Sequence, residues 1–502
     1  MEEPLFACFL LPPDVEAAAA AATTSPPRYP AWVLLDKKGY FADRENATTA
    51  TTTSWTGHTI KVTFCLADPP AVSHFCVHGP EIKPEHFVEE PRVVSSEKDL
   101  VLLSFVFTGG PRSTVLDSHR GEYFIYKAGR GKPSLTPIPA SPPGTTDTLF
   151  MSIVSCYDGD EEEFILADLF VTSTLGYYDL TFFSSKIGTW TTRRLELRTS
   201  SAHIRAMDLF VVPHKVISLG RGVVGWVDLW RGVIGCNFLE KNPYIYFIPL
   251  PKPEFNMSRS GDPKPVRDVA CYNGVITLVE IDHYFIREVV TINNNSNKRL
   301  KMMKDLDSLD IIYDKDLLLD LHENPLGDSR EEIISVPNGW KIRTCYRHTS
   351  SYSWRKGYCI NVDEFSANNP TYSTYLPELL DASVTKSTLR NLTTAYPTLN
   401  INGNDVVYLM SKVDRDDKNA WIVGVDLRKK TIEIAEPYFA ERATYFNPDF
   451  LTCAFSEYLN TTQRSCGDES VISTMRNFVT HGHIFSDCPY HNGVVYGHDN
   501  KQ

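Results

Sequence analysis

The sequence has no long hydrophobic run and no surplus of basic residues. No apolar stretch approaches the ~20 residues that a membrane-spanning helix needs. Its 50 lysines and arginines are outnumbered by 62 aspartates and glutamates, which gives a formal net charge of −12. Binding to nucleic acid generally depends on a basic face that displaces counterions. We therefore expect neither a membrane protein nor a general nucleic-acid binder.

A secretory signal and a disulfide pattern are also missing. The apolar start at Leu5–Leu11 follows Glu2 and Glu3, where a signal peptide would carry basic residues. The 11 cysteines are odd in number and have no regular spacing, which is typical of reduced thiols inside a cell. We predict a cytoplasmic or nuclear monomer without a cofactor.

The chain does contain many short runs of β-branched and aromatic residues. Hydrophobic residues make up 42% and aromatic residues 12% of the sequence, a composition that suits half-buried strands. The clearest unit spans His214–Pro251 and has four expected strands joined by tight turns: Val216–Leu219, Val223–Trp230, Val233–Leu239 and Tyr244–Leu250. Apolar residues alternate onto both faces of the second strand, which predicts that it lies between packed sheets.

Similar units recur along the chain. Expected strands group as Leu100–Phe107, Glu122–Lys127 and Ser134–Ile138; as Glu163–Val171, Tyr178–Ser184 and Thr189–Leu197; and as Asp405–Ser411, Ala420–Asp426 and Thr431–Ala435. Four-stranded meanders of about 40 to 50 residues are typical of propeller blades, and a closed ring leaves no long strand edge exposed. We predict a mainly all-β, propeller-like array of antiparallel meanders, with an undetermined number of blades.

Some segments depart from the meander pattern. Asn273-Gly274 between two apolar runs predicts a two-residue hairpin turn, because both central positions of that turn need positive φ. We expect a few helices in insertions and one near the end of the chain. There Asn447 can cap a helix, Pro448 suits its first position, and an apolar face follows at Phe450, Leu451, Ala454, Phe455, Tyr458 and Leu459.

The expected organisation is a single propeller-like domain with less regular ends. We predict a flexible N-terminal segment at 1–28, because its alanine-rich and Thr-Thr-Ser-Pro-Pro stretches cannot bury enough surface to become ordered. The domain is expected at 29–465, with an irregular insertion around 282–339. A C-terminal tail follows at 466–502.

Several longer stretches identify a family. The segment GWVDLWRG at Gly225–Gly232, the strand Tyr244–Pro251 and the segment Val266–Ala270 together resemble the plant family catalogued as domain of unknown function 1618, which is expanded in grasses. Leu66–His78 resembles the N-terminal portion of that family, and Asp405–Thr431 resembles its C-terminal portion. The resemblance implies family membership over most of the chain and no particular chemistry.

A looser similarity is to the β-propeller-like regions that follow F-box motifs in plant ubiquitin-ligase adaptors. The stretches Tyr178-Asp179-Leu180 and Gly188-Thr189-Trp190 carry it. The F-box itself, a helical segment that precedes the propeller, is missing, and residues 1–30 do not supply it. We therefore do not expect a direct role as a ligase adaptor.

Two groups of residues have types that suit zinc. His74, Cys76 and His78 alternate and would share one face of a strand, with Cys65 across an expected turn at Asp68-Pro69-Pro70. Cysteine is also among the most often buried residues, so core packing with hydrogen-bonded histidines is the alternative that we prefer. The tail carries a second group with loosely ligand-like spacing: His481, His483, Cys488 and His491. Because disorder is common near chain ends, we assign metal to neither group.

Other motifs have simple structural interpretations. Gly220–Gly225 matches the glycine pattern of dinucleotide-binding loops, which requires a following helix, yet the next residues continue as strand. The acidic run Asp158–Glu163 lacks the ligand positions of a calcium loop, and the basic segment Asn297–Lys304 reads as a solvated loop or helix face. Asp228 stands on an otherwise apolar strand and, if buried, must be hydrogen-bonded. We predict that it fixes a turn.

No catalytic signature is present in the sequence. The chain contains no G-x-S-x-G elbow, P-loop or H-E-x-x-H motif, so we assign no catalytic, cofactor-binding or metal residue. We predict a non-catalytic interaction scaffold that binds a protein partner through its loops. The alternative is a hydrolase with its site in the central pocket of the propeller, which converging carboxylates or histidines there would favour.

Overall fold

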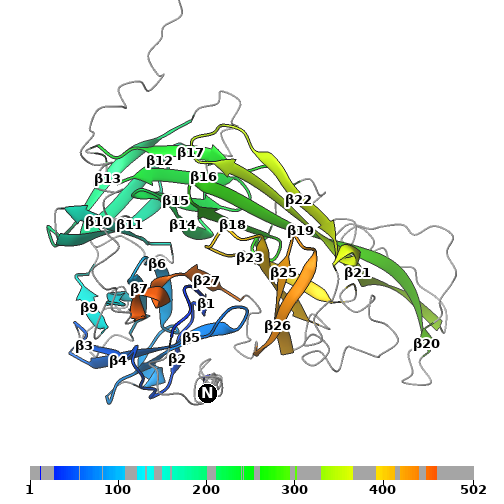
Figure 1. Cartoon of the computed structure of the whole chain (residues 1–502), viewed down its shortest axis with the longest axis horizontal. Coiled ribbons are helices and arrows are strands. Elements are labelled where there is room, and N and C mark those ends of the chain that lie inside the picture. Colours follow the sequence, from blue (N-terminus) through cyan, green and yellow to red (C-terminus); the bar gives the residue numbers. More distant parts are fainter. Residues whose placement is uncertain are drawn as a thin grey trace, which may run out of the picture. The chain divides into compact units, whose positions relative to one another are not determined.

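The computed structural model of the chain describes residues 12, 28–55, 57–81, 83–107, 121–129, 133–140, 150–158, 161–199, 211–238, 240, 242–253, 261–293, 300–301, 329–365, 390, 392–412, 419–439 and 448–460. In these ranges it is almost entirely β, as the sequence predicts, and built from antiparallel meanders (Figure 1). No helix within the described ranges is long and apolar enough to cross a membrane. The described ranges belong to a compact unit that ends at Asn460.

Five successive meanders have four main strands each. The first contains β6 (Arg92–Glu97), β7 (Leu100–Val106), β8 (Gly121–Lys127) and β9 (Ser134–Ile138). The second contains β10 (Ser152–Asp158), β11 (Glu161–Val171), β12 (Tyr177–Ser184) and β13 (Thr189–Arg198). The third contains β14 (Lys215–Gly220), β15 (Val223–Asp228), β16 (Gly232–Asn237) and β17 (Ile245–Pro249).

The last two meanders follow the same order. The fourth contains β18 (Arg267–Tyr272), β19 (Val275–Asn293), β21 (Ser329–His348) and β22 (Arg355–Asn361), with β20 (Leu300–Lys301) beside β19. The fifth contains β23 (Thr393–Leu399), β24 (Val406–Lys412), β25 (Asn419–Asp426) and β26 (Thr431–Phe439). The meander strands named in the sequence analysis are all confirmed to within a few residues.

A sixth sheet joins the two ends of the described chain. Its strands are β1 (Val33–Asp36), β2 (Tyr40–Phe41), β3 (Ala50–Thr53), β4 (Thr59–Cys65), β5 (Val72–His78) and β27 (Phe450–Cys453). β27 pairs antiparallel with β1, with Val33 opposite Cys453. This pairing brings together residues more than 400 positions apart in the sequence.

The leading strands of the sheets form a ring. Each contacts the next in the order β6, β10, β14, β18, β23 and β27, and β27 contacts β6 again. Within the described ranges, this makes a propeller-like ring of six units that is closed by the terminal strands. The second and third meanders also meet at their outer edges, where β13 and β17 pair in parallel.

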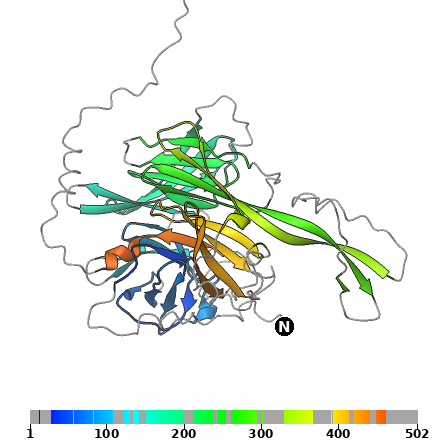
Figure 2. The same ribbon diagram turned by 45° about the vertical axis from the view of Figure 1, so that its right-hand side comes forward.

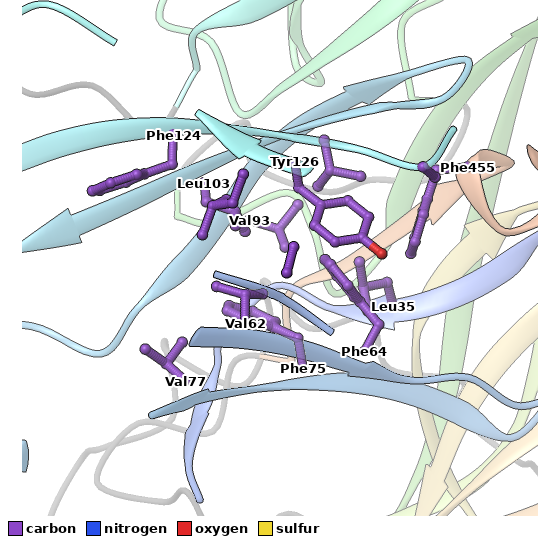
Figure 3. Packing of buried hydrophobic residues seen from close by; sticks show 14 of the residues in the cluster. Leu35, Val62, Phe64, Phe75, Val77, Val93, Leu103, Phe124, Tyr126 and Phe455 are labelled. Carbon is purple, nitrogen blue, oxygen red and sulfur yellow. The ribbon is translucent and has the colours of Figure 1, made fainter. Parts of the chain in front are cut away.

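Buried side chains fill the space between neighbouring sheets. Figure 3 shows one such core, in which Phe64 and Phe75 of the sixth sheet face Phe124 and Tyr126 of the first meander. Phe455 is fully buried in the same core. The strands are apolar on both faces because each sheet packs against two neighbours, as the sequence of the third meander predicts.

The hairpin at Asn273-Gly274 is confirmed. Asn273 has a φ of 48° and Gly274 a φ of 74°, so both central residues adopt the left-handed conformation that the turn requires. The turn joins β18 and β19, in which Tyr272 lies opposite Val275.

The structure differs from the sequence at the insertion expected around 282–339. Its two ends are regular strand, because β19 and β21 remain paired from Val275 opposite His348 to Asn293 opposite Ser329. Figure 2 shows this two-stranded ribbon running beyond the other strands of its sheet. Each half of the ribbon is specified by its pairing with the other half rather than by a local pattern.

The helix expected near the end of the chain was wrong in its first half. Phe450–Cys453 is strand β27, and only Phe455–Leu459 is helical, as a 3-10 helix. Pairing with β1 overrides the local helical pattern, since it satisfies the backbone of 450–453 through a distant strand. Two further 3-10 turns are described, at Pro84–His86 and Val362–Glu364. The predicted segments at 1–28 and 466–502 fall outside the described ranges, apart from Pro12 and Arg28.

Candidate functional site

A groove of ≈ 470 Å³ opens between the fourth and fifth meanders. We call it the inter-sheet groove. Its walls are the ends of β18, β19, β21 and β22 on one side, and the end of β23, the β23–β24 turn, part of β24 and the β25–β26 turn on the other. The residues that line it are Ala270, Tyr272, Val275, Thr277, Thr344, Tyr346, Lys356, Gly357, Tyr358, Leu399, Asn400, Gly403, Asn404, Asp405, Val407 and Leu427.

Tyrosines dominate the open side of the inter-sheet groove. Tyr272 is 43% exposed and Tyr346 is 39% exposed, although both belong to strands. Tyr272 and Tyr346 are two of the eight large apolar side chains that are exposed in the described part of the chain. Exposed aromatic residues gathered in one place are a feature of binding surfaces.

The walls of the groove are held rigidly. Gly403 has a φ of +68°, and a Cβ atom at this position would lie 2.1 Å from the Tyr272 ring. The Tyr272 ring therefore packs directly on the backbone of the β23–β24 turn. In that turn the Asn400 side chain donates a hydrogen bond to the Val406 carbonyl at 2.6 Å and accepts one from the Asn402 amide at 3.0 Å. The groove is preformed.

Charged groups lie at the margin of the groove. Arg428 donates a hydrogen bond to Asp405 at 2.7 Å, and Lys356 lies on the facing wall. Within the groove, the Thr344 hydroxyl accepts a hydrogen bond from the Tyr358 amide at 2.8 Å. The groove thus combines aromatic and aliphatic lining residues with charged groups at its margin.

A second group of charged residues links the leading strands of the ring. We call it the inner-strand cluster; it comprises Lys37, Lys215, Lys264, Asp268 and Asp449. Lys37 donates a hydrogen bond to Oδ2 of Asp449 and Lys264 donates one to Oδ1, each at 3.3 Å. Lys215 donates to Asp268 at 2.6 Å, and Asp268 also accepts a hydrogen bond from the Leu399 amide at 2.9 Å. The bonds of Asp268 connect the third, fourth and fifth meanders, and the Lys264–Asp449 bond connects the fourth meander with the sixth sheet.

The electrostatics of the cluster are those of an ion-pair network. Burial lowers the pKa of the Lys37 ammonium, and Asp449 works against this shift. Burial favours the neutral form of Asp449, but the ammonium groups of Lys37 and Lys264 hold its pKa below the usual value. A general acid for hydrolysis needs a raised pKa. Asp449 is therefore held in the wrong state for that role.

Asp228 has the structural role that its position predicts. It is fully buried, and its Oδ1 accepts hydrogen bonds from the amides of Trp230 at 2.9 Å and Arg231 at 3.1 Å. Its Oδ2 accepts from the Arg231 guanidinium at 2.9 Å and from the Val212 amide at 3.3 Å. The carboxylate thus fixes the turn between β15 and β16.

Three of the four zinc-type residues of the first group come together. Cys65 lies opposite His74 on the paired strands β4 and β5. One ligand atom from each of Cys65, His74 and Cys76 lies within 4.8 Å of the others. His78 does not join them, and its Nε2 lies 3.7 Å from Asp43.

The environment of Cys65 favours the thiolate. A hydrogen bond with Cys76 lowers its pKa most strongly, and the hydrogen bond and charge of His74 and the charge of Arg44 add to this. Burial opposes the shift, and the net pKa is about 5. A thiol with this pKa is ionised near neutral pH.

The remaining motifs are parts of turns and strands or lie outside the described ranges. Gly220, Arg221 and Gly222 form a turn with positive φ between strands β14 and β15, with no helix after it. Asp158 and Glu161 pair at the ends of β10 and β11. Of the basic segment, only the strand Leu300–Lys301 is described. The group His481, His483, Cys488 and His491 is outside the described ranges.

Sequence reasoning did not find the inter-sheet groove. Tyr272 follows an ordinary apolar strand, and Gly403 lies 131 positions later in a polar turn, so no local pattern connects them. The sequence Asn-Gly-Asn at 402–404 indicates a tight turn, but it does not indicate that Tyr272 packs against that turn.

Comparison with known families gives one match. Residues 226–408 match the model of a family described as "Protein of unknown function (DUF1618)". The match includes most of the third meander, the fourth meander and the start of the fifth. It supports the family resemblance over this part of the chain. A search of the curated proteins finds no match.

Solved structures give weak similarities. The chain covers 59% of the Bombyx mori GH32 β-fructofuranosidase BmSUC1, with 66% of its own length aligned, 11% identity and a TM-score of 0.24. It covers 96% of the α-L-arabinofuranosidase Arb93A of Fusarium graminearum, with 72% of its own length, 8% identity and a TM-score of 0.24. It covers 95% of the α-L-arabinanase of Penicillium chrysogenum, with 72% of its own length aligned, 9% identity and a TM-score of 0.23. Scores this low carry no conclusion about activity.

Proposed function

We propose that this protein belongs to the DUF1618 family and is a non-catalytic interaction module, in which the inter-sheet groove binds an extended segment of a partner protein. The observation that carries the proposal is the pair of exposed tyrosines, Tyr272 and Tyr346, at a preformed groove. Tyrosine offers a large, rigid contact area at a low cost in conformational entropy, and it is enriched among the residues that dominate binding energy. The proposal includes a plant origin and a cytoplasmic or nuclear location, supported by the family resemblance and the cysteine pattern.

The rigidity of the groove supports binding of a peptide. Gly403 seats the Tyr272 ring, and the Asn400 hydrogen bonds fix the turn that forms the opposite wall. Because the site is ordered before a ligand arrives, little conformational entropy is lost on the side of the module. The polar rim of Lys356, Asp405 and Arg428 offers ionic and hydrogen-bonding contacts around the aromatic floor, which is the usual anatomy of a protein interface.

The state of the inner-strand cluster favours this function over hydrolysis. Both of its carboxylates, Asp268 and Asp449, already accept hydrogen bonds from lysines. The lysines hold the pKa of Asp449 below its usual value, which does not suit a general acid. The hydrogen bonds of both carboxylates link units of the ring.

Selection of peptides by display on the intact chain tests the proposal. We expect Tyr346→Ala to weaken the binding of a selected peptide about 30-fold, since truncation of a dominant aromatic contact costs about 2 kcal/mol. Tyr458→Ala is the matched control, because Tyr458 is similarly exposed, at 40%, on a different element. Equal affinities of both variants and the unmodified chain for every selected peptide would contradict the proposal.

A further inference from the structure

Cys65, His74 and Cys76 lie on a rigid part of the sheet. They belong to the antiparallel strands β4 and β5, with Cys65 opposite His74 and Cys76 opposite Thr63. The alternate residues of the same strands, Phe64 and Phe75, point into the apolar core shown in Figure 3. Because successive strand residues face opposite sides, the core fixes the two strands while the sulfur and imidazole groups meet on the other face.

The distances among the three side chains suit a metal ion. Their ligand atoms lie within 4.8 Å of one another. Ligands that bind zinc tetrahedrally, with Zn–S near 2.3 Å and Zn–N near 2.0 Å, are themselves about 3.3–3.8 Å apart. Rotation of the two cysteine side chains on the fixed strands would close the difference.

A buried atom of His74 needs a partner. The His74 side chain is 2% exposed, and its Nδ1 makes no hydrogen bond. A buried polar atom in this condition costs free energy, and native structures rarely leave one without a reason. The His74 ring also packs edge-on against Tyr40 at 5.2 Å, which limits its rotation. A metal ion coordinated by the ring would supply a polar partner to this buried imidazole.

We propose that Cys65, His74 and Cys76 form a zinc site with one position open to water. Two thiolates and an imidazole are the ligand types that zinc prefers. Cys65 is partly exposed, whereas His74 and Cys76 are buried, so solvent reaches the site from the Cys65 side. Three protein ligands leave the fourth tetrahedral position to a water molecule. The site is independent of the inter-sheet groove.

Metal analysis of the purified full-length chain tests the site. After incubation with excess zinc under reducing conditions and exhaustive dialysis, we expect about one zinc ion per chain, as for a single tetrahedral site. Cys76→Ser and His74→Asn should each lose that ion. Cys359→Ser, which removes an exposed cysteine on β22, and His78→Gln, which removes the excluded histidine, should keep it.

A second measurement does not depend on the folding of variants. Cobalt added to the unmodified, reduced chain should give the intense charge-transfer absorption of cobalt bound to thiolate, and stoichiometric zinc should abolish it. Zinc retained equally by Cys76→Ser and the unmodified chain would overturn the proposal. So would the absence of a cobalt–thiolate band, or an equal loss of zinc in Cys359→Ser.

Discussion

Asp228 and Asp168 are both buried, but their carboxyl groups differ in the number of hydrogen bonds that they accept. Asp228 accepts four hydrogen bonds, and its isolated position on an apolar strand allowed the sequence to predict that role. Asp168 is 2% exposed on β11 and accepts a hydrogen bond from the Leu169 amide at 2.7 Å, while its Oδ2 has no hydrogen-bond partner. Nothing in the sequence distinguishes Asp168 from a surface acid, because its burial depends on a neighbouring meander.

Asp168 predicts a specific dependence of stability on pH. Burial raises its pKa from 3.8 to about 7. Because the pKa is higher in the folded chain, the folded chain binds this proton more tightly than the unfolded chain does. The free energy of unfolding therefore falls as the pH rises from about 4 to about 7. Asp168→Asn removes the ionisable group and should therefore be increasingly stabilising across that window, with no further gain above it.

Chemical denaturation of the unmodified chain and of Asp168→Asn at several pH values checks this prediction. A difference in the free energy of unfolding that stays constant between pH 4 and 7 would show that Asp168 does not titrate with the raised pKa of about 7. The control is Asp68→Asn, because Asp68 is exposed.

At the scale of elements, the sequence predicted hairpins well and long-range pairings poorly. The turn at Asn273-Gly274 is a local signal, and its hairpin followed from it. The segment at 447–459 carried a convincing helical pattern, yet 450–453 pairs with β1. Such pairing depends on residues at the other end of the chain, and the propensity of a short segment cannot outweigh it.

Glu280 ties together strands of the fourth meander. It is 3% exposed on β19, lies 2.6 Å from the Arg267 guanidinium on β18, and also pairs with Arg343 on β21. Glu280→Gln would leave two buried guanidinium groups beside an uncharged amide. We expect a loss of about 3–5 kcal/mol in the free energy of unfolding, the usual cost of breaking a buried ion pair.

The exposed pair of Lys429 and Glu433 provides the comparison. These side chains are 3.3 Å apart on the surface, so Glu433→Gln should cost less than about 1 kcal/mol. Urea unfolding of both variants measures the difference, and equal losses would show that the Glu280 network does not stabilise the meander.

At the scale of the whole described ring, closure depends on the last strand and the short helix after it. β27 pairs with β1, and the Asn460 side chain accepts a hydrogen bond from the Tyr29 amide at 2.7 Å and donates one to the Tyr29 carbonyl at 3.0 Å. The sequence predicted a closed ring from the absence of an exposed edge. It did not predict the number of units, because the sixth sheet is built from both ends of the described chain.

Phe455 is the side chain that anchors this closure. It is fully buried, with its ring centroid 4.8 Å from that of Phe64 and 6.1 Å from that of Tyr126. Figure 3 shows Phe455 beside these two residues in the core. Phe455→Ala should cost about 3–5 kcal/mol, as expected for deletion of a buried aromatic ring. Tyr458→Ala, which alters an exposed ring in the same helix, should cost less than about 1 kcal/mol. Thermal unfolding compares the two, and similar melting temperatures would contradict the anchoring role.

Hydrogen–deuterium exchange with and without a display-selected peptide tests the central claim most directly, because it locates the binding surface. The account predicts slower exchange at the inter-sheet groove, in the β18–β19 turn, the end of β21 and residues 399–407, with little change at the inner-strand cluster. Protection confined to the strands that carry Lys37, Lys215 and Asp449, with the groove unchanged, would contradict it and place binding at the centre of the ring.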